Sequence, residues 1–130
     1  MATIHVPVTV RNPADLDQCW EGVFLVDTGA TDCMVPRPDL EAIGIQSVGE
    51  REYEMANETR VTYGTAVAQI EFMGEILGAR IILGEPDIEP LLGITALESA
   101  GLEIDPVTQR LKRLPAIQLK QVDSASRPLS

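Results

Sequence analysis

The stretch that most constrains the fold runs from Phe24 to Thr31 and reads Phe-Leu-Val-Asp-Thr-Gly-Ala-Thr. Its three apolar residues favour a buried strand, and Asp27 follows them directly. Thr28 can then form a local hydrogen bond, Gly29 lets the backbone turn, and Ala30 leaves open space beside the carboxylate. A carboxylate at the tip of a buried strand is rarely placed there for stability. This stretch is therefore where chemistry is expected.

The length of the chain fits one domain. A chain of 130 residues can bury one compact core, but a second domain of ordinary size does not fit beside it. We assign residues 1–115 to that domain. Residues 116–130 form a polar C-terminal tail, because from Lys120 onward three serines and a proline replace the apolar pattern. Aromatic residues make up only 4% of the chain, so the core should be mostly aliphatic.

Charge and hydropathy exclude several classes of partner. The formal net charge is −10 at pH 7, and no cluster of Lys and Arg is present to neutralise phosphates, so nucleic acid is not an expected partner. No stretch approaches the ~20 apolar residues of a membrane span, and the N-terminus lacks the pattern of a signal peptide. We expect a cytoplasmic protein with no membrane partner.

Two residue types that could hold a metal or a disulfide are scarce. His5 is the only histidine and lies on the polar face of a predicted strand, so no metal site is expected. Cys19 and Cys33 are too few for a disulfide scaffold. We interpret both as reduced cysteines that pack as small core residues, with one bridge around the central stretch as the alternative.

The rest of the chain is predicted to be mostly strands. Alternating or apolar patterns indicate strands at 3–10, 19–27, 45–55, 59–72, 75–83, 102–105 and 110–114, and residues 91–93 are a short apolar run that ends in glycine. Residues 11–18 contain Asn-Pro and two aspartates and are predicted to be a loop. A long hairpin is expected with its polar tip at Ala56-Asn57-Glu58, where Asn57 can adopt positive φ, and a final hairpin turns at residues 106–109.

Two short helices are predicted between the strands. Pro38 begins one that ends at Gly44. The other has the spacing of a capping box from Thr95 to Glu98 and ends at Gly101. The predicted fold class is therefore all-β, with helices as minor elements.

This order of elements resembles the retropepsin-like aspartic proteases, the single-lobed relatives of pepsin found in retroviruses. The resemblance rests on Asp27-Thr28-Gly29-Ala30 after apolar residues and on Leu91-Leu92-Gly93 about sixty residues later, followed by a short helix and a strand. It covers about residues 3–115. It implies a closed β-barrel or sandwich with a flap hairpin and one short C-terminal helix, active as a two-fold dimer.

The resemblance also implies roles for individual residues. Asp27 would be the catalytic carboxylate, Thr28 would join the active-site loops of two chains, and Gly29 would lie along the peptide backbone. The residues implied in substrate binding are Ala30, Thr31, Asp32, Met55, Ala56, Asn57, Glu58, Leu92 and Gly93. Two features depart from the family pattern: the flap tip contains no glycine, and Thr31 stands where a second acidic residue is common.

The chemistry of such a site requires two chains. Peptide hydrolysis by this route uses two carboxylates that share one proton, one to activate a water and one to polarise the scissile carbonyl. The sequence contains one Asp-Thr-Gly, so the second carboxylate must be Asp27 of another copy. We expect a homodimeric aspartic endopeptidase that needs no cofactor and binds an extended peptide or protein substrate.

Three other interpretations stay open. Asp27-Thr28-Gly29 is also a common turn sequence. A dimer with this fold could bind a peptide, or only join two chains, without cleaving anything. A metal-dependent hydrolase using Asp15, Asp17 and Asp32 lacks histidine partners and ligand spacing.

Overall fold

The computed structural model describes residues 3–117 and 119. This part contains nine strands and two helices of six residues each. The strands are β1 (His5–Asn12), β2 (Asp15–Asp27), β3 (Cys33–Pro36), β4 (Gly49–Glu54), β5 (Arg60–Phe72), β6 (Glu75–Gly84), β7 (Leu91–Gly93), β8 (Leu102–Ile104) and β9 (Leu111–Arg113). The helices are α1 (Arg37–Ala42) and α2 (Ile94–Ser99). Among the described residues, no helix is long and apolar enough to cross a membrane.

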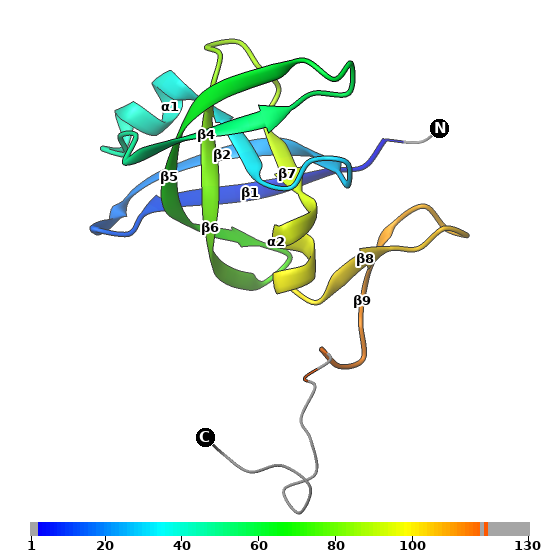
Figure 1. Cartoon of the computed structure of the whole chain (residues 1–130). Coiled ribbons are helices and arrows are strands. Elements are labelled where there is room, and N and C mark those ends of the chain that lie inside the picture. Colours follow the sequence, from blue (N-terminus) through cyan, green and yellow to red (C-terminus); the bar gives the residue numbers. More distant parts are fainter. Residues whose placement is uncertain (1–2, 118, 120–130) are drawn as a thin grey trace, which may run out of the picture.

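Strand pairing closes the main sheet into a barrel (Figure 1). The order of its seven strands is β1-β2-β7-β3-β6-β5-β4, and β1 also pairs with β5. That extra pairing joins the two sides of the sheet, so β4 alone extends outward, from β5. The predicted all-β barrel is confirmed.

The core of the barrel is aliphatic, as the composition predicts. Alternate residues of β1 point inward, and Val6, Val8 and Val10 are buried while their neighbours are not. Phe24 of β2 is fully buried and lies 5.9 Å, centroid to centroid, from the ring of Trp20. Cys33 is buried in this core, but Cys19 is exposed, so its predicted core position is wrong; both cysteines are free.

The predicted loop at residues 11–18 is wrong. β1 and β2 form one antiparallel hairpin that continues to Asn12, which pairs with Asp15. The turn occupies only Pro13 and Ala14, and the Ala14 amide donates to the Asn12 side chain at 2.9 Å. The residues that begin β2 are polar because both their faces are exposed, and polar composition alone does not distinguish such a strand from a loop.

Both helices form where predicted, but one begins differently. α1 has a proline in its first turn, and the chain leaves it through Gly44 at φ +81°. Gly93 takes the N-cap position of α2 in an extended conformation, and no side chain caps that helix. Thr95 therefore lies inside the first turn, and the predicted capping box is wrong. Gly101, at φ +71°, follows the end of α2 as expected.

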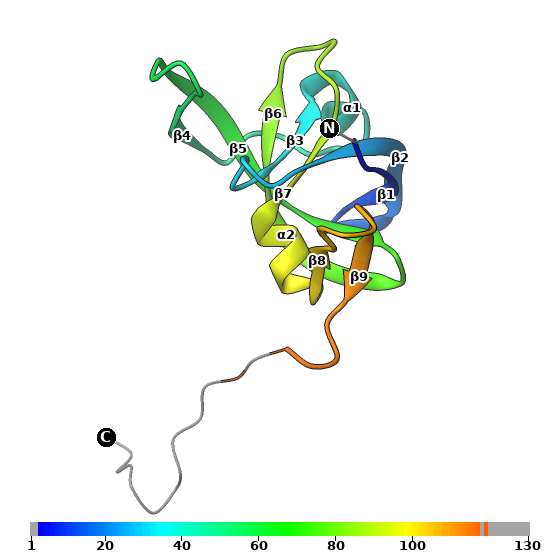
Figure 2. The same cartoon turned by 90° about the vertical axis from the view of Figure 1, so that its right-hand side faces the viewer.

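The β4–β5 hairpin projects from the barrel (Figure 2). Its pairs run from Gly49 opposite Thr65 to Glu54 opposite Arg60, which confirms the predicted hairpin and its tip. The residue with positive φ is Glu58, at 68°, rather than Asn57. Asn57 instead accepts the Thr59 amide through its side-chain oxygen at 3.1 Å, and this local bond shapes the turn.

The final hairpin, β8 and β9, is a separate two-stranded sheet beside α2 (Figure 2). Arg113 connects it to the barrel, because its guanidinium donates to Glu75 at 2.6 Å and to the Met73 carbonyl. The predicted polar tail at residues 116–130 lies mostly outside the described residues, since only 116, 117 and 119 of it are described.

Candidate active site

Asp27 lies at the end of a parallel pair of strands. β2 and β7 pair from Leu25 opposite Leu91 to Asp27 opposite Gly93, so the two apolar runs of the sequence lie side by side. After Asp27 the backbone turns, and the Ala30 amide donates to the Asp27 carbonyl at 3.1 Å. The side chain of Asp27 is half-buried, and its Oδ1 accepts the Gly29 amide at 2.9 Å. The carboxylate is thus fixed in direction at an accessible edge of the barrel.

Gly93 allows the loop after Asp27 to pack directly on β7. A Cβ at Gly93 would lie 2.7 Å from the backbone carbonyl of Asp32 and 2.8 Å from the carbonyl oxygen of Thr31, which no side chain tolerates. Next to Gly93 in the chain, the Ile94 amide at the start of α2 donates to the Ala30 carbonyl at 2.8 Å. The absence of a side chain at Gly93 therefore allows the loop of Asp27-Thr28-Gly29-Ala30 to pack against Leu91-Leu92-Gly93.

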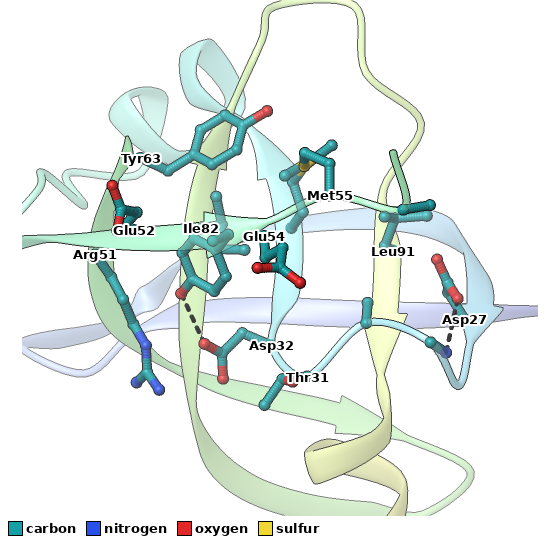
Figure 3. Close-up of a pocket in the computed structure, with 15 residues that line it drawn as sticks. Asp27, Thr31, Asp32, Arg51, Glu52, Glu54, Met55, Tyr63, Ile82 and Leu91 are labelled. Carbon is teal, nitrogen blue, oxygen red and sulfur yellow. Dashed lines mark hydrogen bonds between the residues drawn. The ribbon is translucent and has the colours of Figure 1, made fainter. Parts of the chain in front are cut away.

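A pocket of about 600 Å³ opens between this loop and the hairpin (Figure 3). The loop contributes Asp27, Gly29, Ala30, Thr31 and Asp32. The hairpin contributes residues 51–56 and Tyr63, and the barrel contributes Met34, Ile82 and Leu91. Four carboxylates and one arginine line it: Asp27, Asp32, Glu52, Glu54 and Arg51. The pocket is acidic, although Arg60 lies 3.6 Å from Glu52 and 3.8 Å from Glu54.

The residues predicted from the sequence divide into two groups. Those that line the pocket are Asp27, Gly29, Ala30, Thr31, Asp32, Met55 and Ala56. The others lie outside its lining: Thr28 is exposed beside Asp27, Asn57 and Glu58 are exposed at the hairpin tip, and Leu92 and Gly93 are buried behind the loop. The last two support the site from within the barrel.

Asp32 is the most buried carboxylate of the pocket, with 8% of its surface exposed. The Tyr53 hydroxyl on β4 donates to Asp32 Oδ2 at 2.7 Å, the bond drawn to Asp32 in Figure 3. Burial and this hydrogen bond raise the pKa of Tyr53. The guanidinium carbon of Arg51 lies 5.8 Å from the Tyr53 ring centroid, within the range of a cation–π contact.

Tyr63 also lines the pocket. Its hydroxyl donates to Glu85 at 2.8 Å, and burial followed by this bond raises its pKa. Tyr53 had no predicted role. A signal for both was present, because the chain has only two tyrosines and both fall on the strands of the predicted hairpin. Within the described residues, no group of three or more His, Cys, Asp or Glu side chains is arranged to hold a metal ion.

One family model matches the sequence of the chain. A family model described as "gag-polyprotein putative aspartyl protease" matches residues 21–99, which include the Asp27 loop, the β4–β5 hairpin and β7. Among solved structures, the solution structure of simian foamy virus (mac) protease matches with a TM-score of 0.48 and 15% identity, over 70% of this chain and 90% of that one. No curated protein sequence matches the chain.

Proposed function

The chain belongs to the family of gag-polyprotein aspartyl proteases, and from this premise we propose that it is an aspartic endopeptidase whose active site is formed by Asp27 of two identical chains. The observation that carries the proposal is the position of Asp27, half-buried at the end of β2 and facing a pocket under a projecting hairpin. A single Asp-Thr-Gly occurs in the sequence, so one chain supplies one carboxylate.

A two-fold axis near Asp27 would complete the site. Thr28 and Gly29 are exposed beside the carboxylate in the single chain, as residues at a contact between two copies would be. Thr28 would then join the two active-site loops. Each copy would also contribute its own hairpin, which we call the flap (residues 49–64), and the two pockets together would form an elongated cleft.

The proposed reaction follows from two carboxylates that share one proton. The ionised Asp27 takes a proton from a water molecule, whose oxygen adds to the scissile carbonyl carbon, while the protonated Asp27 donates to the carbonyl oxygen. In the second step the Asp27 that took the proton from water donates it to the scissile nitrogen and the C–N bond breaks, while the other Asp27 takes a proton from a hydroxyl of the tetrahedral intermediate. An amine and a carboxylic acid leave, and the two carboxyl groups again share one proton. The substrate backbone would bind as an extended strand between the Gly29 loop and the flap.

The substrate class is a peptide or protein, and the reaction needs no cofactor. Because the pocket lining is acidic and would repel phosphates, we do not propose nucleic acid as a substrate or partner. A cytoplasmic location remains an expectation from the sequence.

An Asp27→Asn variant tests the proposal. The parent protein and the variant are incubated with a mixed peptide library at several pH values, and cleavage products are identified by mass spectrometry. Asp17→Asn is the matched control, because Asp17 is exposed near the other end of the same strand and lies outside the pocket. We expect cleavage by the parent and by Asp17→Asn, and none by Asp27→Asn.

Identical digests from the parent and Asp27→Asn would contradict the proposal that Asp27 catalyses peptide hydrolysis. If neither protein cleaves but both retain peptides from the library on an affinity column, the chain is instead a non-catalytic peptide-binding or dimerisation module with the same fold.

A further inference from the structure

The flap is attached to the barrel at one end only. β5 pairs with β6 up to Thr65, and from there outward it pairs only with β4 in the part of the chain that the structure describes. Its tip is closed by its own bonds, with the Met55 amide donating to Thr59 at 2.7 Å. The backbone therefore leaves the angle of the flap over the pocket weakly determined, and side chains on its underside must determine that angle.

One such side chain reaches the loop that follows Asp27. The Tyr53 hydroxyl, near the outer end of β4, donates to Asp32 Oδ2 at 2.7 Å (Figure 3). The Asp32 carboxylate is held in a fixed position, because the residue is only 8% exposed and its backbone packs against Gly93. A hydrogen bond to a partly desolvated charged acceptor is among the stronger side-chain bonds. The Tyr53 hydroxyl is protonated at neutral pH, and so able to donate, because the ordinary pKa of tyrosine already lies well above that pH and burial raises it further.

We propose that Tyr53 and Asp32 are positioning residues that hold the flap over the cleft before any substrate binds. Asp32 then acts on the flap, and it is not free to bind a substrate side chain with the oxygen that Tyr53 occupies. The flap tip contains no glycine, and this bond near the tip attaches the outer part of the flap to the barrel. The inference rests on the proposed function only in treating the pocket as the substrate cleft.

The chain offers a matched control in its other tyrosine. Tyr63 also lies on the flap and donates to a carboxylate, Glu85, at 2.8 Å. Two differences make its bond the weaker attachment: Glu85 is exposed, and Tyr63 lies opposite Arg51, closer to the base of the flap than Tyr53. Losing the Tyr63 hydroxyl should therefore leave the flap angle nearly unchanged.

The flap angle can be measured without catalysis. Spin labels are attached to Thr62→Cys on the exposed face of the flap and to Glu98→Cys on α2, in a Cys19→Ser background; Cys33 is buried and stays unlabelled. Labelled protein is mixed with excess unlabelled protein, so that only distances within one chain contribute. Pulsed electron resonance then gives the distribution of label distances for the parent, Tyr53→Phe, Asp32→Asn and Tyr63→Phe.

We expect one narrow distribution for the parent and a raised-flap population that grows about ten-fold in Tyr53→Phe. Asp32→Asn keeps an oxygen that can accept from Tyr53 but loses the charge, so its raised-flap population should lie between those of the parent and Tyr53→Phe, whereas Tyr63→Phe should resemble the parent. An unchanged distribution in Tyr53→Phe, or an equal shift in Tyr63→Phe, would overturn the inference. A shift in Tyr53→Phe alone, in a protein that cleaves no peptide, supports the inference and contradicts only the proposed function. In an active enzyme, Tyr53→Phe should raise KM more than it lowers kcat.

Discussion

Asp27 and Gly93 form the last pair of the parallel ladder between β2 and β7. The pairing places the carboxylate beside the one residue whose missing side chain lets the following loop pack against the barrel. The direction of the Asp27 side chain, fixed by the Gly29 amide, therefore depends on a strand whose paired residue, Gly93, lies 66 positions later in the chain (93 − 27). A substitution at Gly93 should therefore lower the stability of the fold and also change the direction of the Asp27 carboxylate.

Gly93→Ala should destabilise the fold. A Cβ there meets backbone atoms at 2.7 Å, and overpacking of this kind costs about 1–3 kcal/mol. Urea unfolding measures the change in the free energy of unfolding. Gly78→Ala is the control, because a Cβ at that strand position meets nothing within 4 Å. An equal effect of the two substitutions would contradict the role assigned to Gly93.

The thiol of Cys33 should resist ionisation. Burial raises its pKa from the ordinary 9.0 to about 11. Because the folded chain favours the neutral thiol, this contribution to stability is complete below pH ~9 and is lost as the pH rises from about 9 towards about 11. Ultraviolet absorbance of the thiolate, followed in a Cys19→Ser variant, should show its transition near the upper value. A transition at pH 9 in the folded protein would show that Cys33 is not desolvated.

Dimer formation should depend on charge. Each chain carries −10 at pH 7, so two chains bring together −20, a repulsion that salt screens and that mild acid reduces. Sedimentation at low and neutral pH, with and without added salt, should show tighter dimers in mild acid and at higher salt. A dimer of equal affinity under all four conditions would contradict this expectation.

The sequence predicts those parts of the fold that local patterns encode. The apolar run before Asp27, the β4–β5 hairpin, the β8–β9 hairpin and the glycines that end both helices are where the pattern places them. Two local signals were overridden. Gly93 takes the N-cap position that the predicted capping box assigned to Thr95, and the polar start of β2 is a strand because β1 pairs with it.

The contacts that make the site are long-range. Nothing near Asp27 in the sequence indicates that β7 runs parallel beside it, because the side-chain period of a strand does not identify its partner. The Tyr53–Asp32 bond depends on how the hairpin folds back over the loop. The family resemblance therefore implied only substrate binding for Asp32, and the sequence assigned no role to Tyr53.

The central claim is that catalysis needs Asp27 from two chains. Parent protein is mixed with Asp27→Asn in different proportions at constant total concentration, the chains are allowed to exchange, and peptide cleavage is measured. If only dimers with two aspartates are active, an equal mixture should retain about one quarter of the parent activity, because random pairing leaves about one such dimer in four. Retention of about one half, in linear proportion to the parent protein, would show that one Asp27 suffices and would contradict the account.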